Sequence, residues 1–457
     1  MRLRFFNTHE PVTSYYRDLG PYLAREGAQV EICMSGAENR TARSGLEEAL
    51  NHPGIRITRL PSVFKVQRGA ISRVGIILSY ALSAVVYTLL SRGTDLNVFL
   101  SQPPMFSCWG LVLKLIRRQP YCCVVMDVYP DVYVRDGLLK ENSPAFRILR
   151  RLMRLTWRNA AAVVVIGRCM RELVKDAGVE ADRIHVIPNW TNAESVCAAP
   201  GTTSTLRVSE GLGKQFVVLY SGNLGVSHFF DDVLEAARRL KTVNDLKFVF
   251  IGEGSRCAEI EKGIAGHGLD NVLLLPLQPA EQLADSLCLG DVHFICLRPG
   301  FEGLVVPSKA YSALAVGRPI IYQGSGNGEI ARMIAEERIG AVVSPHDPLG
   351  MEKAVLGYYE DRSLVDEQGR RAAELSLTRY SLQNSLKKYR EVLFAASKRP
   401  APSRRGDLQL DWAHREDGCS GDDSKSGRNG LQSMGNRLVA GAPRSSFVHG
   451  RTDRAGG

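Results

Sequence analysis

A loop, a predicted helix start and a lysine follow one another within residues 301–321, and together they could bind a phosphate group. Pro307 suits the first turn of a helix, because its missing N–H would have no partner there. Ser308 and Lys309 would then lie where free backbone N–H groups and the positive end of a helix attract an anion. Gly317 is typical of the end of such a helix. The segment predicts an anion site, although an ordinary helix between two strands would have the same pattern.

Glycines follow a predicted strand at 216–221 and could complete such a site. Gly222 and Gly225 would let the backbone approach a phosphate closely. The departing phosphate of a group-transfer reaction needs this kind of charge stabilisation. The alternative is a plain strand-to-helix turn, which would also use glycine. Nearby His228 is either a further donor or a solvated loop residue, and both interpretations stay open.

Ionisable residues in the first half of the chain fall in loops after predicted strands. His9 and Glu10 follow the first strand, and Asp127 and Asp131 follow the strand at 121–126. Ligands of parallel sheets bind at these strand ends. Asp127 could orient or deprotonate an acceptor hydroxyl, or it could cap its own loop through backbone N–H groups.

Two series of alternating strands and helices must position these residues, and such alternation implies parallel sheets that are covered on both faces. The first series is predicted to have strands at 2–6, 29–34, 96–100, 121–126 and 161–166, with helices over 15–26, 106–117 and 143–158. The second follows a break after Pro188, with strands at 216–221, 248–251, 272–275, 292–296 and 320–322. The fold class is therefore α/β, with two doubly wound, Rossmann-like domains.

Composition narrows the possible functions. The chain has 457 residues, a net charge of +10 and 44% hydrophobic residues, which is ordinary for two or three globular domains. No zinc-finger spacing or long basic run supports nucleic acid, so phosphorylated substrates and anionic lipid surfaces fit the charge better. The ten cysteines form no C-x-x-C pair, which favours a reducing cytosol. The N-terminus is not typical of a signal peptide.

No Asp-x-Asp motif or metal cluster is evident, so we expect no metal and no other cofactor.

Two further segments stand out. The run at 75–90 is the longest apolar stretch, and we expect a buried helix of the first domain, with an interfacial helix at a membrane as the alternative. Residues 399–457 are rich in Gly, Ser, Arg and Asp, and we expect a disordered tail without a catalytic role.

Five segments, in order, resemble the retaining glycosyltransferases of family four. They are 126–131 (MDVYPD), 187–190 (IPNW), 218–225 (VLYSGNLG), 248–254 (FVFIGEG) and the Pro-Ser-Lys-x-Tyr stretch within 301–321. The subgroup that they resemble builds bacterial surface polysaccharides, including colanic-acid-type exopolysaccharide and O-antigen. The resemblance covers residues 1 to about 395.

The resemblance implies the GT-B architecture, in which two domains face each other across a cleft. The implied boundaries are an acceptor-binding domain at 1–193, a nucleotide-sugar domain at 194–378, a helix at 379–398 that returns to the first domain, and the tail. It implies transfer from a nucleotide sugar, expected to be a UDP-sugar, to a lipid-linked saccharide. The enzyme would be cytoplasmic and peripheral on the inner face of the cell membrane.

The resemblance also assigns site residues. Catalytic roles fall to Asp127, Glu302 and Lys309, and the acceptor side to His9, Glu10 and Asp131. Donor-binding positions are Gly222, Asn223, Gly225, Gly252, Glu253, Gly303, Leu304, Ser308 and Ser312. Family members commonly carry two glutamates with seven residues between them, and these align with Leu304 and Ser312, while Glu302 lies two residues early.

Two other functions remain open on the sequence. A UDP-N-acetylglucosamine 2-epimerase-like enzyme has the same two-domain plan and would need no acceptor. A non-catalytic binding subunit is the other alternative, because the family glutamates are displaced. The Pro-Ser-Lys-x-Tyr and Asp-x-Tyr-Pro segments favour transfer.

Overall fold

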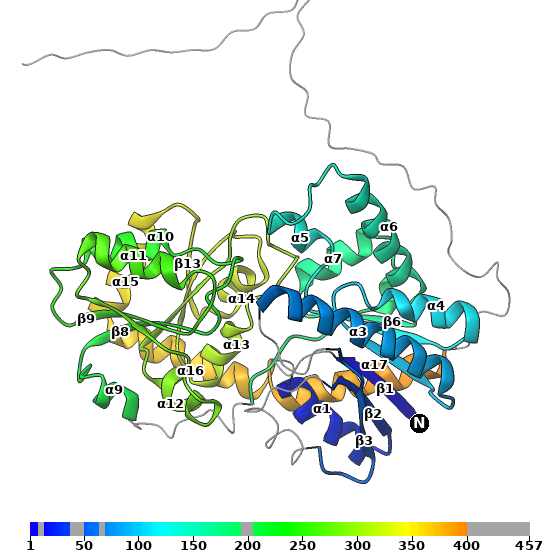
Figure 1. The fold of residues 1–457 in the computed structure, drawn as a ribbon. Helices are drawn as coiled ribbons and strands as arrows, with labels where there is room; N and C mark the ends of the chain where they lie inside the picture. The colour runs from blue at the N-terminus through cyan, green and yellow to red at the C-terminus, as the bar shows by residue number, and fades with distance from the viewer. Residues whose placement is uncertain (8–12, 37–49, 64–68, 193–203, 400–457) are drawn as a thin grey trace, which may run out of the picture. The chain divides into compact units, whose positions relative to one another are not determined.

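The computed structural model describes residues 1–7, 13–36, 50–63, 69–192 and 204–399. His9 and Glu10, predicted on the acceptor side, lie outside the described residues, as does the predicted tail from residue 400 onward. Figure 1 shows the described elements with their labels.

The first domain is a parallel sheet of seven strands in the order β3-β2-β1-β4-β5-β6-β7. Its strands are β1 (Arg2–Asn7), β2 (Gln29–Ser35), β3 (Ile55–Leu60), β4 (Leu96–Leu100), β5 (Tyr121–Val125), β6 (Ala162–Val165) and β7 (Ile184–Val186). Its helices are α1 (Thr13–Arg25), α3 (Gly69–Leu90), α4 (Cys108–Arg117), α5 (Asp131–Arg135), α6 (Pro144–Asn159) and α7 (Arg168–Asp176), with the 3-10 turn η2 (Ala181–Arg183).

The second domain repeats this plan with six parallel strands in the order β10-β9-β8-β11-β12-β13. The strands are β8 (Phe216–Ser221), β9 (Leu246–Ile251), β10 (Val272–Leu275), β11 (Val292–Cys296), β12 (Ile320–Gln323) and β13 (Gly340–Val343). The helices are α9 (Thr205–Ser209), α10 (Asp231–Arg239), α11 (Cys257–His267), η3 (Ala280–Gln282), α12 (Leu283–Cys288), α13 (Lys309–Ala315), α14 (Glu329–Glu337), α15 (Pro348–Glu360) and α16 (Arg362–Leu377). Helix α17 (Leu382–Lys398) follows them along the chain.

Both strand orders reverse direction next to the first strand of the domain, which is the doubly wound, Rossmann-like arrangement. The predicted fold class is thereby confirmed. Central strands such as β5 and β6 are buried along their whole length. They read as continuous apolar runs because helices cover both faces of a parallel sheet. The predicted domain boundaries at 193 and 378 stay a prediction.

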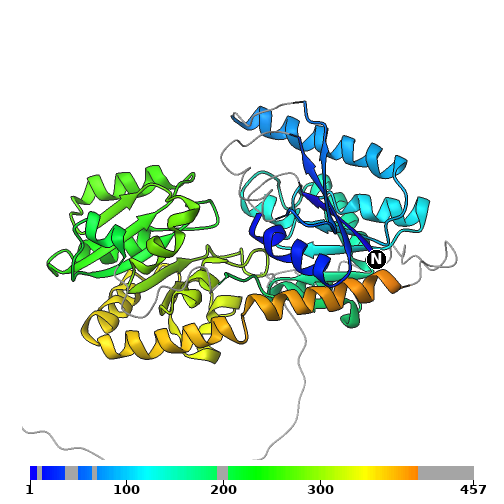
Figure 2. The same cartoon turned by 90° about the horizontal axis from the view of Figure 1, so that it is seen from below.

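The last helix, α17, belongs to the core of the first domain. Ser381 caps it by accepting a hydrogen bond from Asn384 N. Leu386, Tyr389 and Leu393 are buried in one apolar cluster with Tyr15 of α1 and with residues of β4 and β5. Figure 2 shows α17 running along the first domain directly after α16. The chain therefore ties its C-terminal helix to its N-terminal sheet.

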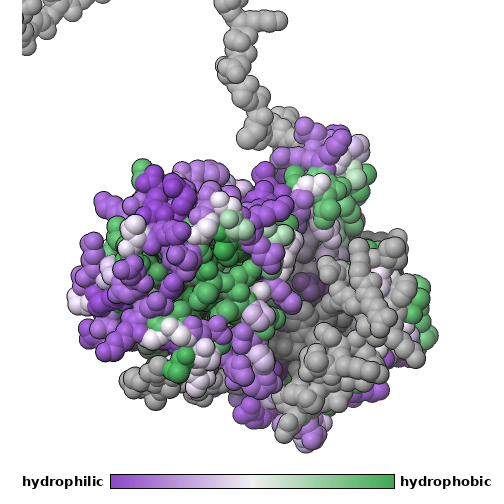
Figure 3. Space-filling model, turned by 60° about the vertical axis from the view of Figure 1, so that its left-hand side comes forward, coloured by the Kyte–Doolittle hydropathy of each residue, from purple (hydrophilic) through white to green (hydrophobic). Residues whose placement is uncertain are grey.

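Helix α3 differs from the expectation for the apolar run at 75–90. The helix begins earlier, at Gly69, and only one side of it is buried. Its outer side exposes large apolar residues, including Leu78 and Leu82, so the predicted buried helix is wrong for that side. Most of the described surface in Figure 3, in contrast, is hydrophilic, with apolar side chains confined to patches.

The burial of α17 predicts a large effect from shortening one of its side chains. Leu393→Ala should lower the free energy of unfolding by about 2–5 kcal/mol, because Leu393 is fully buried and the truncation leaves a cavity. Denaturant unfolding measures this loss. Leu377→Ala, at an exposed leucine of α16, is the matched control and should change stability by about 0.5 kcal/mol or less. Equal effects of the two variants would show that α17 does not stabilise the first domain.

Candidate functional site

Gly222 and Lys309 meet at the point where the second sheet reverses its strand order. Strands β8 and β11 are neighbours there, and Gly222 follows β8 directly. Gly222 has a φ of +129°, and a Cβ at this position would lie 2.8 Å from Lys309 Cε. The glycine thus provides the space through which the lysine side chain passes. The predicted pairing of the glycine loop with Lys309 is what the structure shows.

Lys309 lies among aromatic rings and carries no ion pair with any described residue. Its Nζ is 3.4 Å from His228 Nε2 and 5.0 Å from the centre of the Tyr220 ring. Burial lowers the pKa of Lys309 to about 8. Burial, with the charge of Lys309 beside it, lowers the pKa of His228 to about 3. At neutral pH Lys309 therefore carries a positive charge and His228 is neutral. The charge of Lys309 is thus available to an anion.

Helix α13 starts later than the sequence predicts. Its first residue is Lys309, and Ser308 is the N-cap, without a hydrogen bond from its side chain. Pro307 therefore precedes the helix instead of forming its first turn, so that prediction is wrong. The helix has only seven residues, which makes its dipole a minor source of anion attraction. The charge of Lys309 is the main one.

The glycine turns after β8 and β9 pack against each other through their backbones. A Cβ on Gly252 would lie 2.0 Å from Gly222 O, and one on Gly254 would lie 2.4 Å from Leu224 O. Leu224 N also donates to Glu253 O at 2.9 Å. These contacts bring the predicted positions Gly222, Asn223, Gly225, Gly252 and Glu253 into one cluster. Asn223 and Glu253 have exposed side chains within it.

A second polar cluster surrounds Glu302. Its Oε2 accepts a hydrogen bond from Gly300 N at 2.7 Å, whereas its Oε1 is buried without a partner. The hydroxyl of Tyr322 is likewise buried without a partner. A Cβ on Gly328 would lie 3.2 Å from that hydroxyl and 3.9 Å from Glu302 Cγ, so both groups border the same glycine. Buried polar atoms normally have partners, and two unsatisfied ones beside one glycine make this cluster a candidate polar site.

Tyr322 was not among the residues that the sequence singled out. It occupies the buried strand β12, where an aromatic residue is ordinary core material. The signal that could have found it is its place near the C-terminal end of a strand beside the switch point.

Asp127 lies where the two domains touch. Asp127 forms an isolated antiparallel β-bridge with Val305. The Val128 N–H donates a hydrogen bond to Leu304 O at 2.9 Å. Ser101 Oγ accepts hydrogen bonds from the N–H groups of Met126 and Asp127, at 2.8 and 3.1 Å. Ser101, which the sequence did not suggest, therefore caps the start of this loop.

The carboxyl group of Asp127 has an unusual proton affinity. Burial, together with the nearby charge of Asp136, raises its pKa to about 6. A carboxyl group with a pKa near neutrality is suited to general-base work on a hydroxyl.

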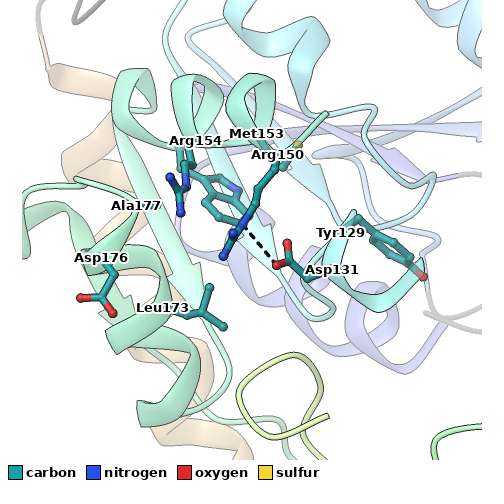
Figure 4. Close-up of a pocket in the computed structure, with 9 residues that line it drawn as sticks. Tyr129, Asp131, Arg150, Met153, Arg154, Leu173, Asp176 and Ala177 are labelled. Carbon is teal, nitrogen blue, oxygen red and sulfur yellow. Dashed lines mark ion pairs between the residues drawn. The ribbon is translucent and has the colours of Figure 1, made fainter. Parts of the chain in front are cut away.

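Asp131, the first residue of α5, lines two adjoining cavities. Arg150 Nε of α6 lies 3.3 Å from Asp131 Oδ1. Figure 4 shows this ion pair, with Arg154 extending from the same helix and Leu173 and Asp176 on α7. One cavity of about 110 Å³ is lined by these residues together with Tyr129, Met153, Trp157 and Ala177. The other, of about 230 Å³, shares Asp131 and Arg150 and extends to Gly300, Glu302 and Leu304.

Arg150 has an ion-pair partner in Asp131, whereas Arg154 has none among the described residues. Burial lowers its pKa, and neighbouring Arg150 lowers it further. In the part of the chain that the structure describes, no carboxylate lies within ion-pair distance of Arg154. Arg154 therefore offers positive charge to whatever enters the smaller cavity.

The predicted residues thus form separate clusters instead of one. Ser312 Oγ lies 3.2 Å from Thr191 Oγ1, at the segment that leaves the first domain, and Ser308 is exposed. Gly303 has a φ of +75° and lies against Cys169 of α7. Among the described residues, no group of three or more His, Cys, Asp or Glu could hold a metal ion.

Ion pairs hold the domain contact next to these clusters. Arg168 Nε lies 2.9 Å from Glu329 Oε1, and Arg168 N donates to Glu329 Oε2 at 2.5 Å. Arg168 NH1 also reaches Glu336. Glu329, at the start of α14, is therefore engaged in the contact and is not free for a ligand.

Known proteins share both domains of this chain. The family model for the glycosyl transferase 4-like domain matches residues 12–190, and that for glycosyl transferases group 1 matches residues 215–361. The probable glycosyltransferase WbjE of Pseudomonas aeruginosa is 29% identical over 60% of this chain and 68% of its own length. The putative colanic acid biosynthesis glycosyl transferase WcaI of Escherichia coli (strain K12) is 30% identical over 44% of this chain and 49% of its own length.

Solved structures share the architecture. Sucrose-phosphate synthase from Thermosynechococcus elongatus has a TM-score of 0.66 at 16% identity, over 87% of this chain and all of its own. Anabaena Alr3699/HepE, solved in complex with UDP and glucose, has a TM-score of 0.65 at 15% identity, over 86% of this chain and all of its own. At this identity the likeness concerns the fold alone. The two family models, in the order of the two domains, together match more than half of the sequence, and the chain therefore belongs to the GT-B glycosyltransferases.

Proposed function

We propose that this enzyme transfers a sugar from a UDP-sugar to a lipid-linked saccharide during assembly of a surface polysaccharide, with retention of configuration. The observation that carries the donor assignment is the partly buried Lys309 ammonium, which lies over Gly222 and has no carboxylate partner among the described residues. The name of WbjE supports glycosyl transfer, that of WcaI supports the polysaccharide context, and the UDP bound to HepE supports the nucleotide. The family assignment favours transfer over epimerisation.

The donor would bind along the two clusters of the second domain. Lys309 would neutralise the departing diphosphate, and the glycine turn at Gly222 would let backbone groups approach it. Because Lys309 supplies this positive charge, the proposed reaction uses no metal ion. Glu302 Oε1 and the Tyr322 hydroxyl, both buried and unsatisfied, would take hydroxyl groups of the nucleotide sugar. In this account Glu302 performs the work of the displaced family glutamate, and the chain is an enzyme instead of a binding subunit.

The acceptor would approach from the first domain. Asp127 would receive the proton of the attacking hydroxyl, because its raised pKa of about 6 leaves it ionised but basic at neutral pH. The cavities at Asp131 and Arg150 would hold the acceptor saccharide. Arg154 suits an acceptor that carries phosphate, as a lipid-linked saccharide does. The enzyme would work in the cytoplasm, at the inner face of the cell membrane.

Lys309→Ala should weaken UDP binding by roughly 10- to 100-fold, because a charge-assisted contact to the diphosphate is lost. The affinity of the unaltered enzyme should also fall as the pH rises above about 8, where Lys309 loses its proton. Titration calorimetry at several pH values measures both effects.

Lys353→Ala is the control for this experiment, because Lys353 is an exposed lysine of the same domain. It should leave UDP affinity and its pH dependence unchanged. Unchanged UDP affinity in Lys309→Ala, with an intact melting temperature, would remove Lys309 from the donor site.

Asp127→Asn should reduce transfer by roughly 10²-fold or more and leave UDP affinity nearly unchanged, since the variant keeps the shape but cannot accept a proton. In the unaltered enzyme the rate should rise with pH through about 6, as Asp127 ionises. Transfer from a panel of UDP-sugars to lipid-linked acceptors is the assay, and NMR of the product reports the anomeric configuration. Full activity in Asp127→Asn would refute the acceptor assignment, and an inverted product would refute retention.

A further inference from the structure

Helix α3 packs on the first sheet through one face. Ile76, Tyr80, Ala84 and Thr88 recur every four residues and are buried. The Tyr80 hydroxyl donates to Cys33 O of β2 at 2.8 Å, which fixes the helix on the sheet. This face satisfies the ordinary requirement of a helix that covers a parallel sheet.

The opposite face of α3 is also apolar. Val74, Leu78, Leu82, Val86 and Leu90, here called the outer stripe, are between 48% and 79% exposed. The only other exposed side chain described in α3 is Leu89, so every exposed side chain there is a large apolar one. A helix that covers a domain in water normally turns polar residues outward. A stripe of this kind indicates a surface that something else covers.

Along the sequence, the charges that flank this helix are almost all of one sign. Residues 49–126 contain a single acidic residue, Asp95, whose carboxylate accepts a hydrogen bond from Arg2 N. The same span contains the basic residues Arg56, Arg59, Lys65, Arg68, Arg73, Arg92, Lys114, Arg117 and Arg118.

Several of these cations lie at the ends of α3 and α4. Arg92 follows the outer stripe by two residues and is exposed, as is Arg118 at the end of α4. Arg117 NH1 donates to the carbonyl oxygens of Thr88 and Ser91, which joins the two helix ends. Leu115 and Ile116, next to Arg117, are exposed apolar residues of α4. Apolar and basic side chains thus gather at one place.

We propose that the outer stripe of α3 docks into the interface of an anionic lipid bilayer. An apolar helix face flanked by Lys and Arg is the composition that binds in the plane of such a membrane, where the apolar side chains enter the headgroup boundary and the cations meet lipid phosphates. No helix in the described part of the chain has the length and apolar content to cross a bilayer. The charge bias selects an anionic membrane over an uncharged partner surface. This inference deepens the proposed function, because a lipid-linked acceptor is presented at the same surface.

The test is flotation of the purified full-length chain with vesicles of phosphatidylcholine that contain about one third phosphatidylglycerol. The unaltered chain should float with these vesicles and bind vesicles of pure phosphatidylcholine more weakly. Leu78→Gln/Leu82→Gln should lower the bound-to-free ratio by about tenfold or more, because two apolar anchors are lost. Both leucines are exposed, so the melting temperature should not change.

Two control variants make the test specific. Leu349→Gln/Leu377→Gln removes two comparably exposed leucines from the second domain and should leave vesicle binding unchanged. Arg92→Gln/Arg118→Gln should reduce binding to the anionic vesicles toward the level of the neutral ones. UDP affinity, measured by calorimetry, should be the same in all of these variants, which separates this inference from the donor assignment.

Three results would overturn the proposal. The first is a failure of the unaltered chain to float with anionic vesicles, and the second is a Leu78→Gln/Leu82→Gln variant that floats as well as the unaltered chain. The third is a concentration-dependent dimer of the unaltered chain that this variant dissociates, since the occupant of the outer stripe would then be a second copy of the chain.

Discussion

The site depends on one electrostatic constraint, a partly buried ammonium group that has no carboxylate partner among the described residues. Lys309 lies between a neutral histidine and an aromatic ring, and burial has already lowered its pKa to about 8. A cation in such surroundings is costly unless an opposite charge is supplied. The strand order explains why this group lies where a ligand can reach it, because β8 and β11 diverge at the switch point and leave their loops side by side.

Other polar groups near the domain contact also lack hydrogen-bond or ion-pair partners among the described residues. Glu302 Oε1 and the Tyr322 hydroxyl are buried without partners, and Arg154 has no ion-pair partner among the described residues. Leaving a buried polar group unsatisfied costs about 1–3 kcal/mol. Several such groups near one domain contact are understandable if donor and acceptor supply the missing partners. The ion pairs of Arg168 with Glu329 and Glu336 hold the contact without using these groups.

The sequence predicts the parts of this structure that rest on repeating patterns. Buried strands such as β5 and β8 were found because both faces of a parallel sheet are covered, which makes the strand apolar throughout. Strand β3 was missed because it is only partly buried and carries Arg56 and Arg59 between its apolar residues. Strand β13 was missed because it is short and only partly buried. Gly222 and Lys309 were found from two separate local patterns, a glycine after a predicted strand and a lysine at a predicted helix start.

The remaining features depend on tertiary contacts that no local pattern encodes. Tyr322 reads as a core residue until its hydroxyl is seen beside Glu302 and Gly328. Ser101 is an ordinary loop serine until its hydroxyl is seen to bind the N–H groups of Asp127 and Met126. The apolar run of α3 has the same composition whether both of its faces are covered or only one. Only the folded structure shows that the outer stripe is exposed to solvent.

The central claim is that Lys309 is the positive charge that meets the donor diphosphate, and proton uptake on UDP binding tests it most directly. An anion next to the ammonium stabilises its protonated form and raises its pKa from about 8. Calorimetric titration of UDP at about pH 8.5, in buffers that differ in ionisation enthalpy, counts the protons that are taken up. The account predicts uptake of a substantial fraction of one proton, which disappears in Lys309→Met. Binding without proton uptake, or the same uptake in Lys309→Met, would contradict it.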